Sequence, residues 1–162
     1  MSTLKLHSTS SKSFQLRNEL PSDPKYLLQF DGGANPNPGP CAGAFVIYKL
    51  ETNEIIFEGG KFMEEGTNNV GEYTGLYEGL KMCKEQNLDC ILIEGDSKLV
   101  VYQVTNQWKI NHQHIREYYM KIQDLLKKFK SISIRHVYRE HNSKADQLSD
   151  ETLEKKKSWI RF

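Results

Sequence analysis

The sequence predicts an α/β domain with a five-stranded mixed sheet flanked by helices, its elements in the order β-β-β-α-β-α-α-β-α. Short apolar runs bounded by turn residues dominate residues 26–62, and apolar residues at helical spacing begin at residue 73. The chain has 162 residues, enough for one domain, and its 38% hydrophobic and 27% charged residues are typical of a globular protein. This composition excludes collagen-like and wholly disordered chains.

Three strands are expected first. An apolar run at residues 26–30 stops at an Asp-Gly pair, which is common in tight turns. Three prolines restrict the backbone of residues 35–40, which we expect to form a loop. Residues 42–50 and 55–62 predict the two strands of a hairpin, connected by residues 51–54.

Helices and further strands follow. Apolar side chains at positions 73, 76, 77, 80 and 83 form the stripe of an amphipathic helix. The remaining elements are expected to be a strand at 90–93, helices at about 97–106 and 112–129, a strand at 132–137 and a last helix at about 145–155. This alternation predicts an antiparallel meander followed by parallel strands joined by helical crossovers.

The two ends of the chain differ in composition from the domain expected at residues 26–155. Residues 1–25 are rich in Ser and Thr and have no acidic residue before Glu19, so we expect a flexible extension. An organelle transit peptide has a similar composition and is the alternative for this segment. We expect residues 156–162 to be a short basic tail.

Composition also bears on location and partners. No apolar run approaches the ~20 residues of a membrane-spanning helix. The three widely spaced cysteines, at positions 41, 83 and 90, match neither a disulfide framework nor a zinc site. We therefore expect an intracellular monomer in a reducing compartment, cytoplasmic or nuclear, with no membrane partner.

Charge is unevenly divided along the chain, although the formal net charge is only +1. Residues 1–96 hold 8 Lys and Arg against 14 Asp and Glu, a balance of −6, whereas residues 97–162 hold 14 against 7, a balance of +7. An acidic pocket and a basic surface on one domain suit a metal-binding protein that handles polyanions. Solvated faces produce such splits too, so charge alone leaves the function open.

Four acidic residues stand at the expected ends of elements. Asp31 follows the first strand and Asp96 the fourth, while Glu72 and Asp146 open the first and last helices. If the first and fourth strands are parallel neighbours, Asp31 and Asp96 leave the sheet at the edge where open α/β sheets place their ligands. Clustered carboxylates repel one another and stay together only when cations neutralise them.

The chemistry of these acids points to magnesium. Mg²⁺ prefers a few carboxylates together with substrate phosphate oxygens, and Mn²⁺ takes similar ligands. Two such ions can clamp the attacking water and the leaving oxygen of a phosphodiester. The acids also have a local explanation, because Asn69 with Glu72, and Ser143 with Asp146, have capping-box spacing. Spacing alone therefore leaves both interpretations open.

Four segments carry a more specific signal, because they occur in order and at suitable separations. They are DGGA at 31–34 with NPGP at 37–40, TNNVGEY at 67–73, GDSKLVV at 95–101 and HVYREHNSKAD at 136–146. With them, residues 26–153 resemble type I ribonuclease H, and most closely its compact branch in archaea, some bacteria and plant reverse-transcriptase-like domains. The resemblance implies the ribonuclease H-like fold.

The resemblance also implies an activity. It makes Asp31, Glu72, Asp96 and Asp146 the catalytic acids that bind two Mg²⁺ ions. The expected reaction is hydrolysis of the RNA strand of RNA/DNA hybrids without sequence specificity, leaving 5′-phosphate and 3′-hydroxyl ends.

Five polar residues match positions that contact the substrate in the family. Asn37, Asn68 and Asn69 match residues that reach the minor groove, and an Asn amide can both donate to and accept from a 2′-hydroxyl. Thr67 and Asn106 match positions near the pocket that grips a phosphate of the DNA strand. Loop and cap chemistry also favours these residue types.

The chain departs from many relatives in two places. The stretch before Asp146 is too short for the flexible loop that carries a histidine in those relatives, so Arg139 or His141 is expected to take its role in proton transfer or product release. Asp150, one turn beyond Asp146, is either a substitute carboxylate or a solvated residue. The basic protrusion after the second helix is missing, which leaves the lysines at 127, 128, 130 and 155–157 as candidates for phosphate contacts.

Two other functions remain open from the sequence. The same fold acts on double-stranded RNA or on DNA in other nucleases, and a domain can keep the fold as an inactive nucleic-acid-binding module. The three asparagines favour recognition of a 2′-hydroxyl over a DNA nuclease. Retention of four mutually repelling acids argues against a binding module.

Overall fold

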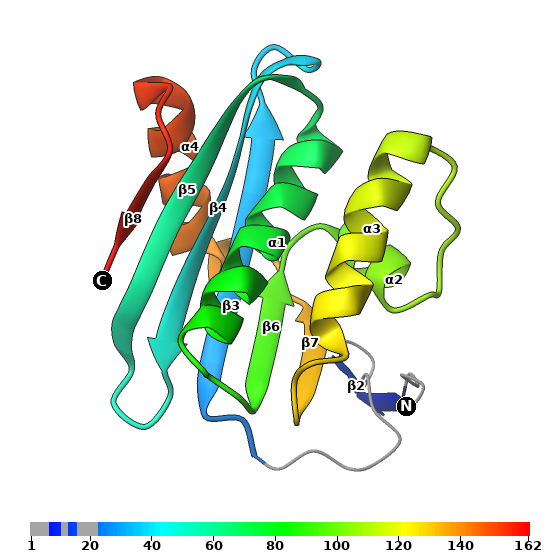
Figure 1. Cartoon of the computed structure of the whole chain (residues 1–162), viewed down its shortest axis with the longest axis vertical. Coiled ribbons are helices and arrows are strands. Elements are labelled where there is room, and N and C mark those ends of the chain that lie inside the picture. The colour runs from blue at the N-terminus through cyan, green and yellow to red at the C-terminus, as the bar shows by residue number, and fades with distance from the viewer. Residues whose placement is uncertain (1–6, 11–12, 16–22) are drawn as a thin grey trace.

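A computed structural model describes residues 7–10, 13–15 and 23–162. One mixed sheet forms the centre of the domain, with the strand order β1-β2-β7-β6-β3-β4-β5-β8 (Figure 1). Its outer strands are β1 (His7–Ser10), β2 (Ser13–Gln15) and β8 (Trp159–Arg161). The five predicted strands are β3 (Tyr26–Ala34), β4 (Gly39–Lys49), β5 (Glu54–Gly66), β6 (Ile91–Gly95) and β7 (Ile132–His136). β3, β4 and β5 pair antiparallel, whereas β6 and β7 run parallel to β3, as the sequence predicted.

Helices cover both faces of the sheet. They are α1 (Asn68–Glu85), α2 (Lys98–Val104), α3 (Gln113–Leu126) and α4 (Ser143–Lys155), with a short 3₁₀ turn, η1, at Arg139–His141. α1 and α3 pack side by side on one face, and α4 packs on the other (Figure 1).

Alternation along β4 builds the two layers of the core. Phe45 and Ile47 belong to the large buried cluster that contains the apolar stripe of α1. Ala44 and Val46 point the other way and pack with apolar residues of α4. Successive side chains of a strand face opposite sides of a sheet, so one strand supports both helices.

β3 is longer than the sequence predicted. The Asp-Gly pair suggested that the strand ends before Asp31, but β3 continues to Ala34 and pairs with β4 over this whole stretch. Antiparallel pairing with β4 satisfies the backbone beyond the point at which β6 has ended. Asp31 is therefore held within a strand, which restrains its position more than a turn would.

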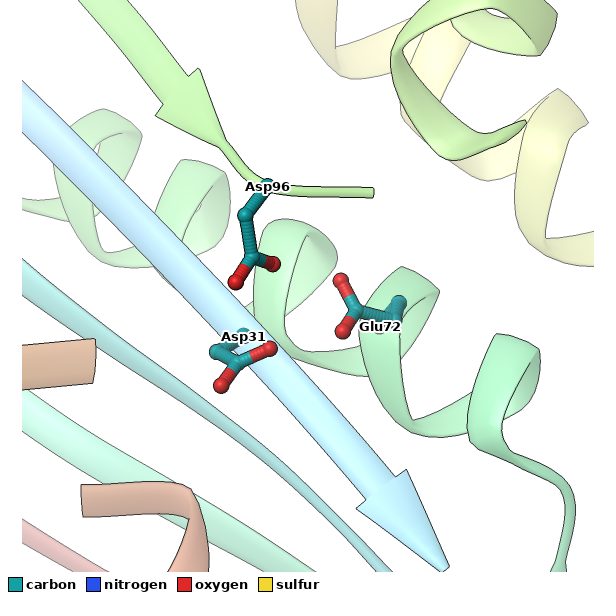
Figure 2. Close-up of side chains that lie close together, drawn as sticks. All are labelled: Asp31, Glu72 and Asp96. Atoms are coloured by element: carbon teal, nitrogen blue, oxygen red, sulfur yellow. The ribbon is translucent and has the colours of Figure 1, made fainter. Parts of the chain in front are cut away.

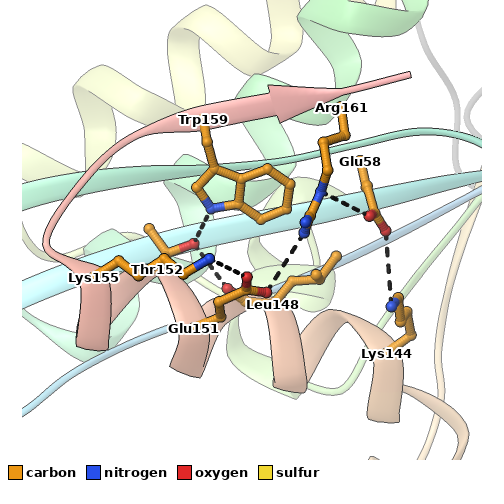
Figure 3. Close-up of polar contacts among 8 residues, drawn as sticks. All are labelled: Glu58, Lys144, Leu148, Glu151, Thr152, Lys155, Trp159 and Arg161. Atoms are coloured by element: carbon orange, nitrogen blue, oxygen red, sulfur yellow. Dashed lines mark hydrogen bonds and ion pairs between the residues drawn. The ribbon is translucent and has the colours of Figure 1, made fainter.

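The C-terminal segment, expected to be a short basic tail, contains a strand that packs on the domain. Its residues Trp159–Arg161 form β8, which pairs antiparallel with β5. The Trp159 indole N–H donates to Thr152 Oγ1 of α4 over 2.9 Å, and the Arg161 guanidinium contacts both Glu58 of β5 and Glu151 of α4 (Figure 3). These contacts hold the strand against α4.

Part of the N-terminal segment also differs from the expected flexible extension. β1 (His7–Ser10) and β2 (Ser13–Gln15) pair with each other, and β2 pairs with β7, so the backbone of these residues extends the sheet. Residues 1–6, 11–12 and 16–22 lie outside the described residues, and a targeting role for this segment stays a prediction. No helix in the described part of the chain is long and apolar enough to cross a membrane.

Candidate active site

The ends of two neighbouring strands place two acidic residues at one edge of the sheet. β3 and β6 pair in parallel, and their pairing ends with Phe30 opposite Gly95. Asp31 and Asp96 are the next residues of the two segments, so both follow the last paired position. This is the arrangement that the sequence predicted for these two carboxylates.

Glu72 reaches the same edge from α1, because glycines let the helix backbone contact the strand. A Cβ on Gly32 would lie 2.1 Å from the carbonyl carbon of Gly71, and one on Gly71 would lie 2.5 Å from the carbonyl oxygen of Ala42. A larger side chain at either position would therefore push α1 away from the sheet. At this close approach the Gly32 N–H donates to Glu72 Oε1, with a donor–acceptor distance of 3.3 Å.

The carboxylates gather around one hollow of about 550 Å³. One side-chain oxygen from each of Asp31, Glu72 and Asp96 lies within 4.8 Å of the other two (Figure 2). Asp146, in the first turn of α4, lines the same hollow. The structure thus brings together the four predicted acids, three of them in close proximity. We call this space the carboxylate hollow.

Burial and mutual repulsion raise the pKa of the clustered acids. Burial raises the pKa of Asp31 to about 7; a hydrogen bond with Glu72 opposes this shift, and the charge of Asp96 adds to it. Burial raises the pKa of Glu72 well above its usual range, and its hydrogen bond with Asp31 acts in the same direction. The pKa of Asp96 is also raised, by burial and then by the charge of Asp146. The fully ionised cluster is therefore unfavourable without a cation.

The donor set fits a divalent cation. Glu72 Oε2 is buried and receives no hydrogen bond from any described donor. Leaving a buried acceptor unsatisfied is costly, and a bound metal ion satisfies it. Carboxylate oxygens around a hollow with room for water suit Mg²⁺, and Mn²⁺ accepts the same ligands.

Two of the three asparagines, Asn37 and Asn68, make hydrogen bonds that connect the start of α1 to the end of β3 and the loop after it. The Asn37 side-chain oxygen accepts from the Asn68 N–H over 3.1 Å, and the Asn68 side-chain oxygen accepts from the Ala34 N–H over 2.8 Å. Asn68 and Asn69 line the carboxylate hollow, whereas Asn37 acts on it through Asn68.

Neither Thr67 nor Asn106 lines the carboxylate hollow. Thr67 is the N-cap of α1, and its hydroxyl accepts from the Val70 N–H over 3.2 Å. Asn106 has a left-handed backbone with a φ of 65°, and its side chain accepts a hydrogen bond from the Tyr119 hydroxyl. It lines a separate hollow of about 590 Å³ between α2 and α3, together with Trp108.

The structure distinguishes Arg139 from His141, the two residues expected to take the role of the histidine that many relatives carry. Arg139 lines the carboxylate hollow, and its Nη2 lies 3.7 Å from Asp146 Oδ1. His141 lines another hollow, beside Gln29 and Tyr48. Only Arg139 is placed to act on a group bound at the carboxylates.

Sequence reasoning assigned no role to two glycines of the site and left Asp150 open. Gly71 and Gly75 both touch strand backbone, and their spacing of four along α1 was an available signal. Asp150, left open between two interpretations, is exposed and borders the carboxylate hollow. Burial and the charge of Asp146 raise its pKa, and the charge of Arg139 opposes them.

Comparison with known proteins agrees with this geometry. Residues 29–152 match the model of a family described as reverse transcriptase-like. Ribonuclease HI of Halobacterium salinarum is 37% identical over 125 residues, which cover 77% of this chain and 62% of that protein. Ribonuclease H of Helicobacter pylori is 33% identical over 131 residues, which cover 77% of this chain and 87% of that protein. The chain belongs to the ribonuclease H family.

Solved structures of ribonuclease H extend the agreement to the fold. RNase H1 of Halobacterium salinarum superposes with a TM-score of 0.77 at 35% identity, covering 80% of this chain and 98% of that one. LC11-RNase H1, solved in complex with an RNA/DNA hybrid, gives a TM-score of 0.75 at 28% identity, covering 81% and 98% of the two chains. Some ribonuclease H relatives are longer: a bifunctional protein of Mycobacterium tuberculosis is 32% identical, but the match spans only 36% of its length.

Proposed function

We propose that this chain is an endoribonuclease that hydrolyses the RNA strand of RNA/DNA hybrids without sequence specificity. The observation that carries the proposal is the cluster of Asp31, Glu72 and Asp96 oxygens within 4.8 Å, at the sheet edge of a ribonuclease H family member. A related RNase H1 was solved with an RNA/DNA hybrid, which supports this substrate class for the chain described here. The products are 5′-phosphate and 3′-hydroxyl ends.

The four acids would hold two Mg²⁺ ions, with Mn²⁺ as a substitute. When bound, such a pair supplies an activated water and stabilises the leaving 3′ oxygen of a phosphodiester. Asp31 is restrained within β3, and one of its oxygens lies within 4.8 Å of an oxygen of Glu72 and of Asp96, so it would be a ligand of these ions. Asp146 is 32% exposed, which leaves its carboxylate accessible from the substrate side.

Arg139 would act on phosphate rather than on a proton. A guanidinium stays protonated at all physiological pH values, so it does not serve as a general acid or base. Its planar donors match phosphate oxygens, and its position beside Asp146 places it next to the reacting phosphodiester or the 5′-phosphate product. We therefore assign Arg139 to product release rather than to proton transfer.

Asn68 and Asn69 would recognise the RNA strand. The Asn68 carbonyl oxygen is occupied by the Ala34 N–H, which orients its NH₂ group as the donor for a 2′-hydroxyl oxygen. Asn37 holds the backbone of Asn68 in place. A 2′-hydroxyl is absent from DNA, so these contacts would distinguish the two strands of a hybrid.

The experiment that tests the function uses a hybrid with a labelled RNA strand, and RNA and DNA duplexes of the same sequence. The wild-type chain and an Asp96→Asn variant are incubated with Mg²⁺ or Mn²⁺, and the product ends are mapped. We expect metal-dependent cutting of the RNA strand of the hybrid alone, lost in the variant. Cutting of a control duplex would instead assign a different nuclease activity. Binding of the hybrid with no cutting in either metal would identify an inactive binding domain.

A further inference from the structure

Asn142 is a fully buried polar residue at the start of α4, and its side chain does not cap that helix. An asparagine at the N-cap ordinarily accepts a hydrogen bond from the first turn. Here its side-chain NH₂ group instead donates to the backbone carbonyl oxygen of Phe30, over 2.9 Å. A carbonyl oxygen only accepts, so this contact also settles which end of the amide faces β3.

The backbone of Asn142 makes two further hydrogen bonds that lead to the carboxylate hollow. Its carbonyl oxygen accepts from the N–H of Asp146 over 3.1 Å, and its N–H donates to the carbonyl oxygen of Arg139 over 3.0 Å. Phe30 directly precedes Asp31. Asn142 thus bonds to the backbone of Arg139 and Asp146, which both line the carboxylate hollow. It also bonds to the backbone of Phe30, the neighbour of Asp31, which lines the hollow too.

Taken together, these three hydrogen bonds link β3 to η1 and α4, which lie far from β3 in the sequence. The side chain reaches across 112 positions to β3, while the backbone bonds fix η1 and the first turn of α4. The separation between Asp31 and Asp146 therefore depends on this side-chain hydrogen bond, in addition to a second one from Gln29 of β3 to η1 and the packing of α4 on the sheet.

Asn142 is also a poor choice for stability alone. Its side-chain oxygen is buried and has no hydrogen-bond partner among the described residues. An unsatisfied buried acceptor is unfavourable. What an asparagine provides here is a side-chain NH₂ group that reaches the carbonyl oxygen of Phe30.

We propose that Asn142 is a positioning residue of the carboxylate site, which sets the spacing of Asp31, Arg139 and Asp146 and thereby the affinity for the divalent ions. This inference rests on the proposed function. Removing a residue that orients metal ligands without binding the metal itself typically lowers metal affinity or activity by about 10–100-fold.

The test uses Asn142→Ala and Asn142→Ser, with Gln29→Leu as the matched control. Serine keeps a good N-cap residue at the start of α4 but is too short to reach Phe30, so this variant separates the side-chain contact from helix initiation. Gln29 is buried on the same strand and donates to the His141 carbonyl oxygen over 2.9 Å. Gln29 therefore holds His141, the residue next to Asn142, but contacts no residue that lines the carboxylate hollow.

Three readouts are needed: thermal unfolding without metal, Mn²⁺ binding by titration calorimetry at a temperature where each variant is folded, and steady-state kinetics on the hybrid. We expect all three variants to melt at a lower temperature. Both Asn142 variants should also weaken Mn²⁺ binding by about tenfold or more and lower kcat with little change in KM for the hybrid. Gln29→Leu should bind Mn²⁺ as the wild type does.

The outcomes separate this inference from the proposed function. If folded Asn142→Ser binds Mn²⁺ as tightly as the wild type, or if Gln29→Leu weakens binding equally, Asn142 is only a structural residue. If the wild-type chain binds no Mn²⁺ or Mg²⁺, the proposed function itself fails.

Discussion

Gly32 and Gly71 bring β3 and α1 into backbone contact, so close that a Cβ on Gly32 would lie 2.1 Å from the carbonyl carbon of Gly71. The contact determines where the first turn of α1 lies relative to the end of β6. Glu72 follows Gly71 directly, and its carboxylate reaches Asp31 and Asp96 as a result. The spacing of the acidic cluster therefore depends on two residues without side chains.

Gly71→Ala is expected to destabilise the fold and to weaken the cation site. The added methyl group would lie 2.5 Å from the Ala42 carbonyl oxygen, and backbone cannot move as a flexible side chain does. Overpacking of this kind costs about 1–3 kcal/mol. Urea unfolding would measure the stability and calorimetry the Mn²⁺ affinity.

Gly33→Ala, in the neighbouring strand β3, is the matched control. Its Cβ would meet only the Asn68 side-chain oxygen, at 3.6 Å, which is ordinary contact. The change in unfolding free energy should stay within about 0.5 kcal/mol. Equal destabilisation by the two alanines would show that the close contact of Gly71 is not what holds α1.

The sequence predicted the elements well because their signals are local. The spacing of Tyr73 to Cys83 indicated α1, and the apolar runs indicated the strands. The edge shared by Asp31 and Asp96 followed from the rule for parallel strands. The extension of β3 to Ala34 was missed, because its pairing partner on β4 is remote in sequence and overrides the turn preference of Asp-Gly.

Contacts that join distant segments were the ones that the sequence left unassigned. Nothing local to Trp159 indicates that its indole meets Thr152 or that Arg161 meets Glu58. Likewise, an asparagine before a helix is normally interpreted as a cap, and only the fold shows that Asn142 contacts Phe30. Arg139 and His141 were equivalent candidates in the sequence, and η1 directs them to different hollows.

The metal-free protein should lose stability as the pH rises through about 7. The folded-state pKa of Asp31 is about 7, above its usual value of 3.8, so folding favours the protonated carboxyl. This contribution is complete below pH 3.8 and is lost as the pH rises through 7. The raised pKa values of Glu72 and Asp96 act in the same direction.

Unfolding midpoints measured in a chelator between about pH 5 and 8 would check this, because below pH 7 the unfolded chain has lost the Asp31 proton while the folded protein still holds it. We expect the midpoint to fall with pH, to fall less in Asp31→Asn, and to recover when Mg²⁺ is added. A midpoint that stays level or rises over the same interval would mean that the acids are ionised without cost in the folded state.

Trp159→Ala should destabilise the domain by about 1–3 kcal/mol, as expected for losing a partly buried aromatic side chain and its hydrogen bond. The indole donates to Thr152 of α4 and stacks against the Arg161 guanidinium, 4.2 Å from the ring centre. Arg161→Ala should cost less than about 1 kcal/mol, because its ion pairs are half-exposed.

Ile160→Ala is the control for the C-terminal strand, because its side chain is 55% exposed and lies between the other two positions. Thermal unfolding of the three variants should rank Trp159→Ala as the most destabilised and Ile160→Ala as the least. A large loss from Ile160→Ala would indicate that β8 contributes through its other face.

Arg139→Ala should slow turnover, whereas His141→Ala should leave it nearly unchanged. Arg139 lies beside Asp146 at the carboxylate hollow, and His141 lines a different one. A guanidinium that binds phosphate stabilises the charge of the transition state, or offers the 5′-phosphate product a partner that competes with the groups holding it at the carboxylates. We therefore expect a loss of about tenfold or more in kcat for Arg139→Ala, with Arg139→Lys recovering part of it because the positive charge remains.

Steady-state and single-turnover kinetics on one hybrid distinguish the two steps. If Arg139 serves product release, Arg139→Ala lowers the steady-state rate while the single-turnover rate stays near that of the wild type. If both rates fall together, the guanidinium acts in the chemical step instead. A loss in His141→Ala that matches the loss in Arg139→Ala would contradict the placement of the two residues, because only one of them borders the carboxylates.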